Sequence, residues 1–141
     1  MTGVNLALSL LDEIHRDQYV ALYADPRGPM TRVVRSSVPF PSTAVAVACY
    51  ERVVQVIDQL GRTGRVVLTD MRLSAGRNDP EFEEAMNRLR PQLYRGMVRI
   101  GVLVKTATGA LQIRRLVQED GIERRISTDE AELLEYLRTG R

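Results

Sequence analysis

The residues best suited to chemistry lie in three short polar segments of the chain. The first is the stretch TDMRLSAGRNDPEFEE, residues 69–84, which follows the apolar run at 66–68. The candidate side chains are Asp70, Arg72, Ser74 and Arg77 in that stretch, Lys105, Thr106 and Thr108 in the second segment, and Ser127 and Asp129 in the third.

The basic members of this set point to the binding of a phosphate or a carboxylate. The guanidinium groups of Arg72 and Arg77 and the ammonium group of Lys105 bind such anions. A helix that starts near Gly109 would add free backbone N–H groups to the same site. This interpretation predicts an anion site without a catalytic step.

A second interpretation assigns the same segments to helix starts alone. In it Asp79, Thr108 and Ser127 cap helices, and the arginines are solvated. The glutamates at positions 81, 83 and 84 favour this view, because they already place negative charge at one helix start. The residues themselves leave both interpretations open.

The sequence contains no set of residues arranged for catalysis or for binding a metal ion. His15 is the only histidine, and it has no Ser or Cys partner arranged as a nucleophile needs. The position of Asp70 at a strand end is similar to that of the aspartate in a response-regulator receiver domain. That chemistry needs a further acidic pair to hold Mg²⁺, and the nearest candidate, Asp25, stands alone. Cys49 is the only cysteine, and GRTGR lacks the lysine of a phosphate loop. We therefore expect no catalytic residue, no metal site and no cofactor.

The elements that position these residues are predicted from periodicity and turn signals. Two β-rich segments, 19–24 and 31–38, flank DPRGP and predict a β-hairpin. Residues 1–16 fit a short amphipathic helix or a partly ordered arm. The remaining elements are expected in this order: helix 42–60 with Ser42 as N-cap, strand 65–69, a helix from Asp79 that Pro91 ends or kinks, strand 98–104, helix 108–119, strand 122–126, and a last helix opened by a Ser127–Glu130 capping box.

This order predicts a single α/β domain over residues 17–141, preceded by the segment 1–16. Strands separated by single helices imply right-handed crossovers and a mixed, mostly parallel sheet with an antiparallel hairpin at its start. In such sheets ligands bind beyond the carboxyl ends of the strands. We therefore expect the three polar segments to share one rim of the sheet.

Composition excludes several classes of protein. The chain has 141 residues, 44% hydrophobic and 27% charged, with a net charge of +2, which is typical of one globular domain. Without a basic tail or tryptophan, nucleic-acid binding is not expected. No apolar run is long enough to cross a membrane and no basic n-region opens the chain, so we expect a cytoplasmic protein without membrane insertion.

Over residues 19–138 the sequence resembles the SpoIIAA-like (STAS) family of bacterial regulatory domains. The resemblance rests on the hairpin start, on VVLTDMR with GRNDPEFEE, on RIGVLVKTATGALQIRR, and on the closing STDEAELLEYL. It implies the SpoIIAA-like fold: a hairpin followed by α-β-α-β-α-β-α. Family members that antagonise anti-sigma factors carry a phosphorylatable Ser or Thr at the start of the helix after this strand. Here that helix starts NDPEFEE, and Ser74 is displaced into the loop.

The resemblance implies a non-enzymatic signalling module that docks to a protein partner, an unidentified regulator or a kinase-like protein. We expect docking through the rim loop 70–79 and the adjoining helix. Whether the chain forms a homodimer is a question that the sequence leaves open. The alternative is a sensor that binds a small anionic or lipid-like ligand at the same rim. An enzyme is the third and least favoured reading.

Overall fold

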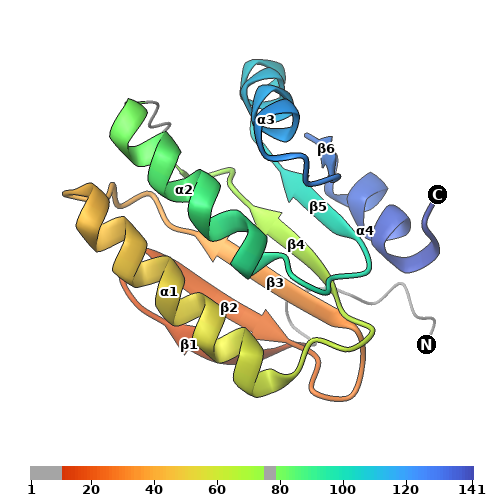
Figure 1. The fold of residues 1–141 in the computed structure, drawn as a ribbon. Coiled ribbons are helices and arrows are strands. Elements are labelled where there is room, and N and C mark those ends of the chain that lie inside the picture. The colour runs from red at the N-terminus through yellow and green to blue at the C-terminus, as the bar shows by residue number, and fades with distance from the viewer. Residues whose placement is uncertain (1–10, 75–78) are drawn as a thin grey trace.

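A computed structural model describes residues 11–74 and 79–141 of the chain. The elements are, in chain order, β1 (Asp12–Arg16), β2 (Val20–Ala24), β3 (Met30–Arg35), α1 (Thr43–Leu60), β4 (Val66–Asp70), α2 (Pro80–Leu93), β5 (Ile100–Leu103), α3 (Ala107–Asp120), β6 (Arg125–Ser127) and α4 (Glu130–Thr139). Figure 1 shows them as one sheet with helices packed on it.

The strands form a six-stranded sheet in the order β1-β2-β3-β4-β5-β6, so each strand pairs with its neighbours along the chain. β1, β2 and β3 pair antiparallel, and β3 to β6 pair parallel. The predicted α/β class and mixed, mostly parallel sheet are confirmed. The β-hairpin is confirmed as well, formed by β2 and β3.

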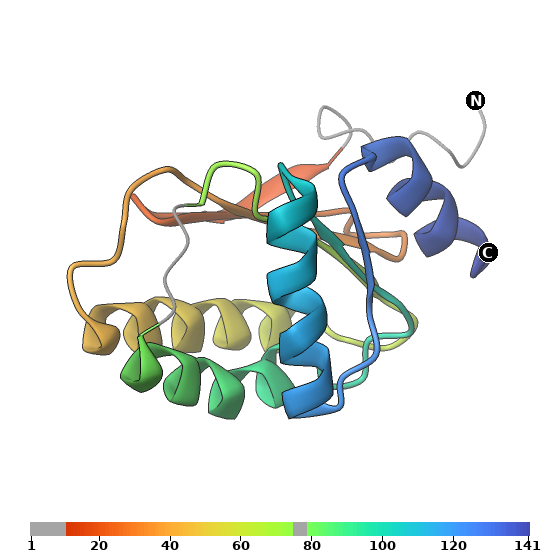
Figure 2. The same cartoon turned by 90° about the horizontal axis from the view of Figure 1, so that it is seen from above.

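The helices cover the two faces of the sheet unequally. In Figure 2, α1 and α2 lie on one side of the sheet, and α4 lies on the other. Strand residues such as Val33 and Val67 belong to the core under α1 and α2. Leu68 packs instead with Leu133 and Leu137 of α4. Adjacent residues of β4 therefore face opposite layers, as the alternation of a strand requires.

Helix α3 packs at the far end of the face that α1 and α2 cover. Ala110 contacts the core around Val102 and Val104, and Ile113 packs against its edge. Ala110 is the only fully buried residue of α3. Figure 2 shows α3 running across the direction of α1 and α2. Residues of α2, α3 and the sheet line a pocket.

Some predicted elements are wrong in position or type. Residues 12–16 form strand β1, which pairs with β2, whereas a short helix or an arm is predicted there; residues 1–10 lie outside the described part. α2 continues through Pro91 to Leu93, so Pro91 does not end this helix. Leu93 and the following Tyr94 are buried, and their packing holds the last turn in place.

The helix starts also differ in part from the predicted caps. Ser42 and Asp79 cap α1 and α2 as expected. Thr106, not Thr108, caps α3. Asp129 caps α4, and Ser127 accepts a hydrogen bond from the Asp129 N–H instead of forming the predicted capping box. An aspartate two residues after a serine offers a competing cap, which the spacing rule does not resolve.

Candidate functional site

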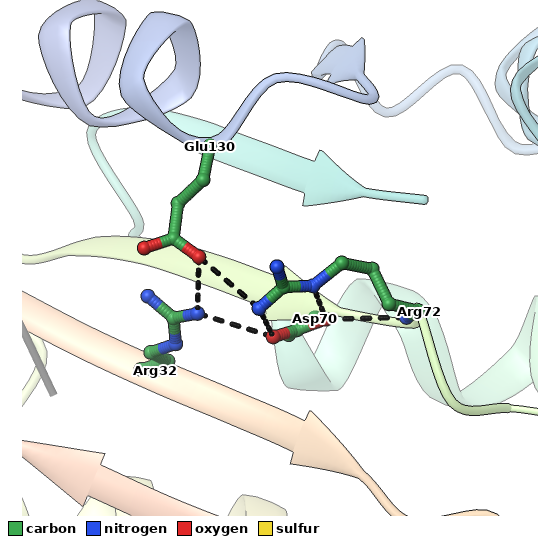
Figure 3. Close-up of polar contacts among 4 residues, drawn as sticks. All are labelled: Arg32, Asp70, Arg72 and Glu130. Carbon is green, nitrogen blue, oxygen red and sulfur yellow. Dashed lines mark hydrogen bonds and ion pairs between the residues drawn. The ribbon is translucent and has the colours of Figure 1, made fainter. Parts of the chain in front are cut away.

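Asp70 and Arg72 belong to a compact group of charges at the end of β4, which we call the Asp70 cluster: Arg32, Asp70, Arg72 and Glu130 (Figure 3). Arg72 donates to Asp70 from Nε (3.0 Å), from Nη2 (2.8 Å) and from its backbone N–H (3.1 Å). Arg32 Nη2 donates to Asp70 Oδ2 at 3.1 Å and to Glu130 Oε1 at 3.0 Å. Arg72 Nη2 lies 3.1 Å from the same Glu130 oxygen.

The Asp70 cluster is electrically balanced, and two of its members, Asp70 and Arg32, are buried. Asp70 is 5% exposed and Arg32 is 3% exposed. Burial alone would raise the pKa of Asp70, but the hydrogen bonds and charge of Arg72, with the bond from Arg32, lower it below its ordinary value. Two carboxylates thus compensate two guanidinium groups, and no positive charge remains for an external anion.

The cluster instead joins the sheet to the last helix. Arg32 lies in β3, Asp70 ends β4, and Glu130 is the first residue of α4. Glu130 also sits in the first turn of α4, where a carboxylate is favoured by the helix dipole. The contacts of Asp70 and Arg72 therefore serve a structural role, and their predicted binding role stays a prediction.

The other predicted site residues are not gathered around this cluster. Ser74 lines a pocket on the opposite face of the sheet. Thr106 accepts a hydrogen bond from the Gly109 N–H as the cap of α3, and Lys105 and Thr108 are exposed. Arg77 lies outside the described residues. The ends of β4, β5 and β6 lie side by side, with Asp70 paired to Leu103 and Leu103 to Ser127, so the three segments leave the same rim as expected. Asp70 and Ser74 nevertheless serve opposite faces of the sheet.

The pocket lies between α2, α3 and the sheet face that α1 and α2 cover, and Tyr50 of α1 also lines it. Its volume is about 370 Å³, within the range of small-molecule sites. Its apolar wall includes Phe40, Phe82, Met86, Leu89, Val102 and Ile113. Above this wall an ion pair connects the two helices, with Arg115 Nη2 of α3 3.2 Å from Glu83 Oε1 of α2.

Arg35 is the most unusual polar residue of the pocket. It lies at the end of β3, is 3% exposed, and donates to the backbone carbonyls of Tyr19 and Val38. Its guanidinium carbon lies 4.2 Å from the centre of the Phe40 ring. Within residues 11–74 and 79–141 it forms no ion pair. Buried charges normally have a charged partner, so Arg35 brings an uncompensated positive charge to the pocket.

Two tyrosines add hydroxyl groups to the pocket wall. The Tyr94 hydroxyl lies 2.9 Å from Thr69 Oγ1, so that pair is satisfied. The Tyr50 hydroxyl has no protein hydrogen-bond partner in the part of the chain that the structure describes. Burial raises the pKa of Tyr50, an effect that Arg35 opposes, and the phenol stays protonated at neutral pH. Tyr50 is therefore an available hydrogen-bond donor.

The far end of the pocket holds a second basic group. Arg124 binds both carboxylate oxygens of Asp120 at 3.0 Å, and Arg90 Nη1 lies 3.4 Å from the same carboxylate. Burial would raise the pKa of Asp120, but the bonds and charge of Arg124 lower it. Asp120 therefore already compensates much of the positive charge at this end.

Arg35, Tyr50 and the pocket itself were not predicted from the sequence. One signal was present: in MTRVVR, period two places Arg35 on the same strand face as Thr31 and Val33. A charged residue on a core-facing position at a strand end is a candidate for binding. The pocket had no such signal, because it depends on the orientation of α3.

Two findings on the described residues concern metal ions and membranes. In the described ranges, no three His, Cys, Asp or Glu side chains are grouped closely enough to hold a metal ion. None of the helices described is both long enough and apolar enough to cross a membrane. Comparison with family models, with curated proteins and with solved structures gives no match for this chain, so the resemblance to the STAS family stays a prediction.

Proposed function

We propose that this protein is a binding module, or sensor, for a small molecule that has an apolar body and an anionic group. The ligand occupies the pocket between α2, α3 and the sheet. The observation that carries the proposal is Arg35, a buried guanidinium without an ion pair among the described residues, which lines a pocket of about 370 Å³. This is the small-ligand alternative of the sequence analysis, moved from the rim to the pocket.

The chemistry of the wall supports this function. Aromatic and aliphatic side chains favour an apolar body, because transferring apolar surface out of water contributes about 25 cal/mol per Å². A few polar groups then fix the orientation of the ligand, which is the usual composition of small-molecule sites. Apart from Arg35, the basic side chains that line the pocket, Arg90, Arg115 and Arg124, all have acidic partners.

Filling the pocket tests the proposal. Native mass spectrometry of freshly purified protein, and thermal shift with a panel of acyl and aryl acids, will report a bound or stabilising ligand. Ile113→Trp places an indole in the space that the ligand needs and should abolish the stabilisation. Gln118→Trp, on an exposed position of the same helix, is the matched control. A panel without any stabilising compound, or equal stabilisation of both variants, would contradict the proposal.

A second candidate, docking of a protein partner through loop 70–79 and α2, is favoured by one observation. Leu73 is 62% exposed in that loop, and burying its apolar side chain against a partner would be favourable. Arg72 is a poor test of this candidate because it holds Asp70. Leu73→Glu should instead remove any specific partner, including a second copy of the chain, while small-ligand binding persists. Retained capture by Leu73→Glu counts against docking at this loop.

A further inference from the structure

We infer that the ligand is a monocarboxylate whose carboxylate binds Arg35 and the Tyr50 hydroxyl, with its apolar body lying along α2 and α3. This inference rests on the proposed function and adds the class and the orientation of the ligand. It follows from the charge, the free donors and the surroundings of Arg35.

The charge of Arg35 favours one negative group in the ligand. No carboxylate of the described residues forms an ion pair with it, and the stretches 1–10 and 75–78 contain no Asp or Glu. Asp17, which approaches Cys49 nearby, is bound to the backbone N–H groups of Tyr19 and Val20. A buried charge without a partner is strongly unfavourable, so a ligand that supplies one negative charge is stabilised there.

The free donors match a carboxylate. A guanidinium has five N–H donors, and two hydrogen bonds of Arg35 go to the carbonyls of Tyr19 and Val38. The remaining donors, with the Tyr50 hydroxyl, are enough for the two oxygens of a carboxylate. Phe40 connects the two residues: Arg35 lies over its ring, and the Phe40 and Tyr50 ring centres are 6.0 Å apart.

The same count disfavours a phosphate monoester. Such a group carries about −1.5 to −2 charges at pH 7, whereas the described residues at the Arg35 end of the pocket supply one uncompensated positive charge. At the other end, Asp120 already occupies Arg124 and lies near Arg90. A carboxylate placed there would face the carboxylate of Asp120. The structure therefore favours the Arg35 end for the acid group.

Isothermal titration with three probes of equal chain length tests the inference: decanoate, 1-decanol and decyl phosphate. The proteins are the wild type, Arg35→Met, Arg90→Met and the control Arg52→Met, which removes an exposed arginine of α1. Losing a hydrogen-bonded charge pair lowers affinity by about 10- to 100-fold. We expect decanoate to bind the wild type at least tenfold more tightly than decanol or decyl phosphate. Arg35→Met should weaken decanoate at least tenfold and change decanol less than about threefold.

The outcomes distinguish failure of the proposed function from failure of the carboxylate assignment to Arg35. If no probe binds the wild type, the proposed function fails. If decanol binds as tightly as decanoate, or if Arg90→Met weakens decanoate more than Arg35→Met does, the function stands and the carboxylate assignment to Arg35 is wrong. Preference for decyl phosphate also overturns the assignment. Decanol binding shows that Arg35→Met is folded. If that variant does not fold, Arg35→Lys replaces it, and it should bind decanoate more weakly than the wild type because an ammonium group lacks the paired N–H donors of a guanidinium.

Discussion

Replacing Asp70 with asparagine will measure what the Asp70 cluster contributes to stability. The amide has nearly the shape of the carboxylate but no charge. Its NH₂ group donates hydrogen bonds where a carboxylate oxygen accepts them. Arg32, which is 3% exposed, then keeps Glu130 as its only carboxylate partner in the described structure. We expect Asp70→Asn to lower the free energy of unfolding by about 3–5 kcal/mol, the usual effect of breaking a buried ion pair.

The magnitude comes mainly from Arg32 and not from Arg72. The side chains of Arg32 and Asp70 are 4% and 7% exposed, so that pair is shielded from water. The Arg72 side chain is 43% exposed, and an ion pair open to solvent contributes about 0–1 kcal/mol. Removing Arg72 alone should therefore cost about 1 kcal/mol, clearly less than removing the carboxylate.

Urea unfolding followed by far-ultraviolet circular dichroism suits this chain, which has no tryptophan. Asp70→Asn, Arg72→Met and the wild type are compared at pH 7 in the same buffer. A loss below about 1 kcal/mol for Asp70→Asn, or one no larger than that of Arg72→Met, would refute the assignment of the cluster as the buried link between sheet and α4.

Three other predictions concern pH, the cysteine and the core beneath α4. Asp70 and Asp120 have pKa values lowered in the folded protein, so the stability that they contribute is present above their unfolded pKa of about 4 and is lost as pH falls through the folded values. The urea concentration at the midpoint of unfolding should thus decrease as the pH is lowered below about 5. The decrease should be less steep in Asp70→Asn. Burial and nearby Asp17 raise the pKa of Cys49 to about 12, so iodoacetamide at pH 8 should modify the native protein at least about 100-fold more slowly than the unfolded chain, and equal rates would contradict this. Leu133 is 0% exposed, and Leu133→Ala should cost about 2–5 kcal/mol in the urea assay, with a loss below about 1 kcal/mol as the contrary result.

The order of the elements was predictable because it depends on local patterns. Apolar residues recur at helical spacing from 45 to 60, and Ser42 and Asp79 are common N-caps, so the helix starts there were found within a residue. β1 was missed because its sequence, DEIHR, is polar and largely exposed, which gives no alternation to read. It is a strand because the edge of β2 offers it backbone partners.

The candidate site was harder to predict because it depends on which face each side chain occupies. Asp70 lies on the α4 face of the sheet, where it meets Arg32, a residue 38 positions earlier. No local pattern announces that pairing. The pocket likewise arises because α3 buries little of its own apolar surface against the sheet. Arg35 was predictable only as a charge on a core-facing position, and its missing partner is a property of the folded chain.

The sequential order of the strands has a consequence for how the chain folds. Each strand joins the one made before it, so the sheet can grow along the chain without waiting for distant segments. Pairing between consecutive strands avoids contacts across the whole chain, and a smaller sequence separation between contacting residues favours faster folding. The bond from Arg32 to Glu130 is the exception, since it joins residues 98 positions apart. A ribosome-bound chain that has not yet exposed Glu130 can therefore assemble the sheet while the positive charge of Arg32 still lacks its second carboxylate.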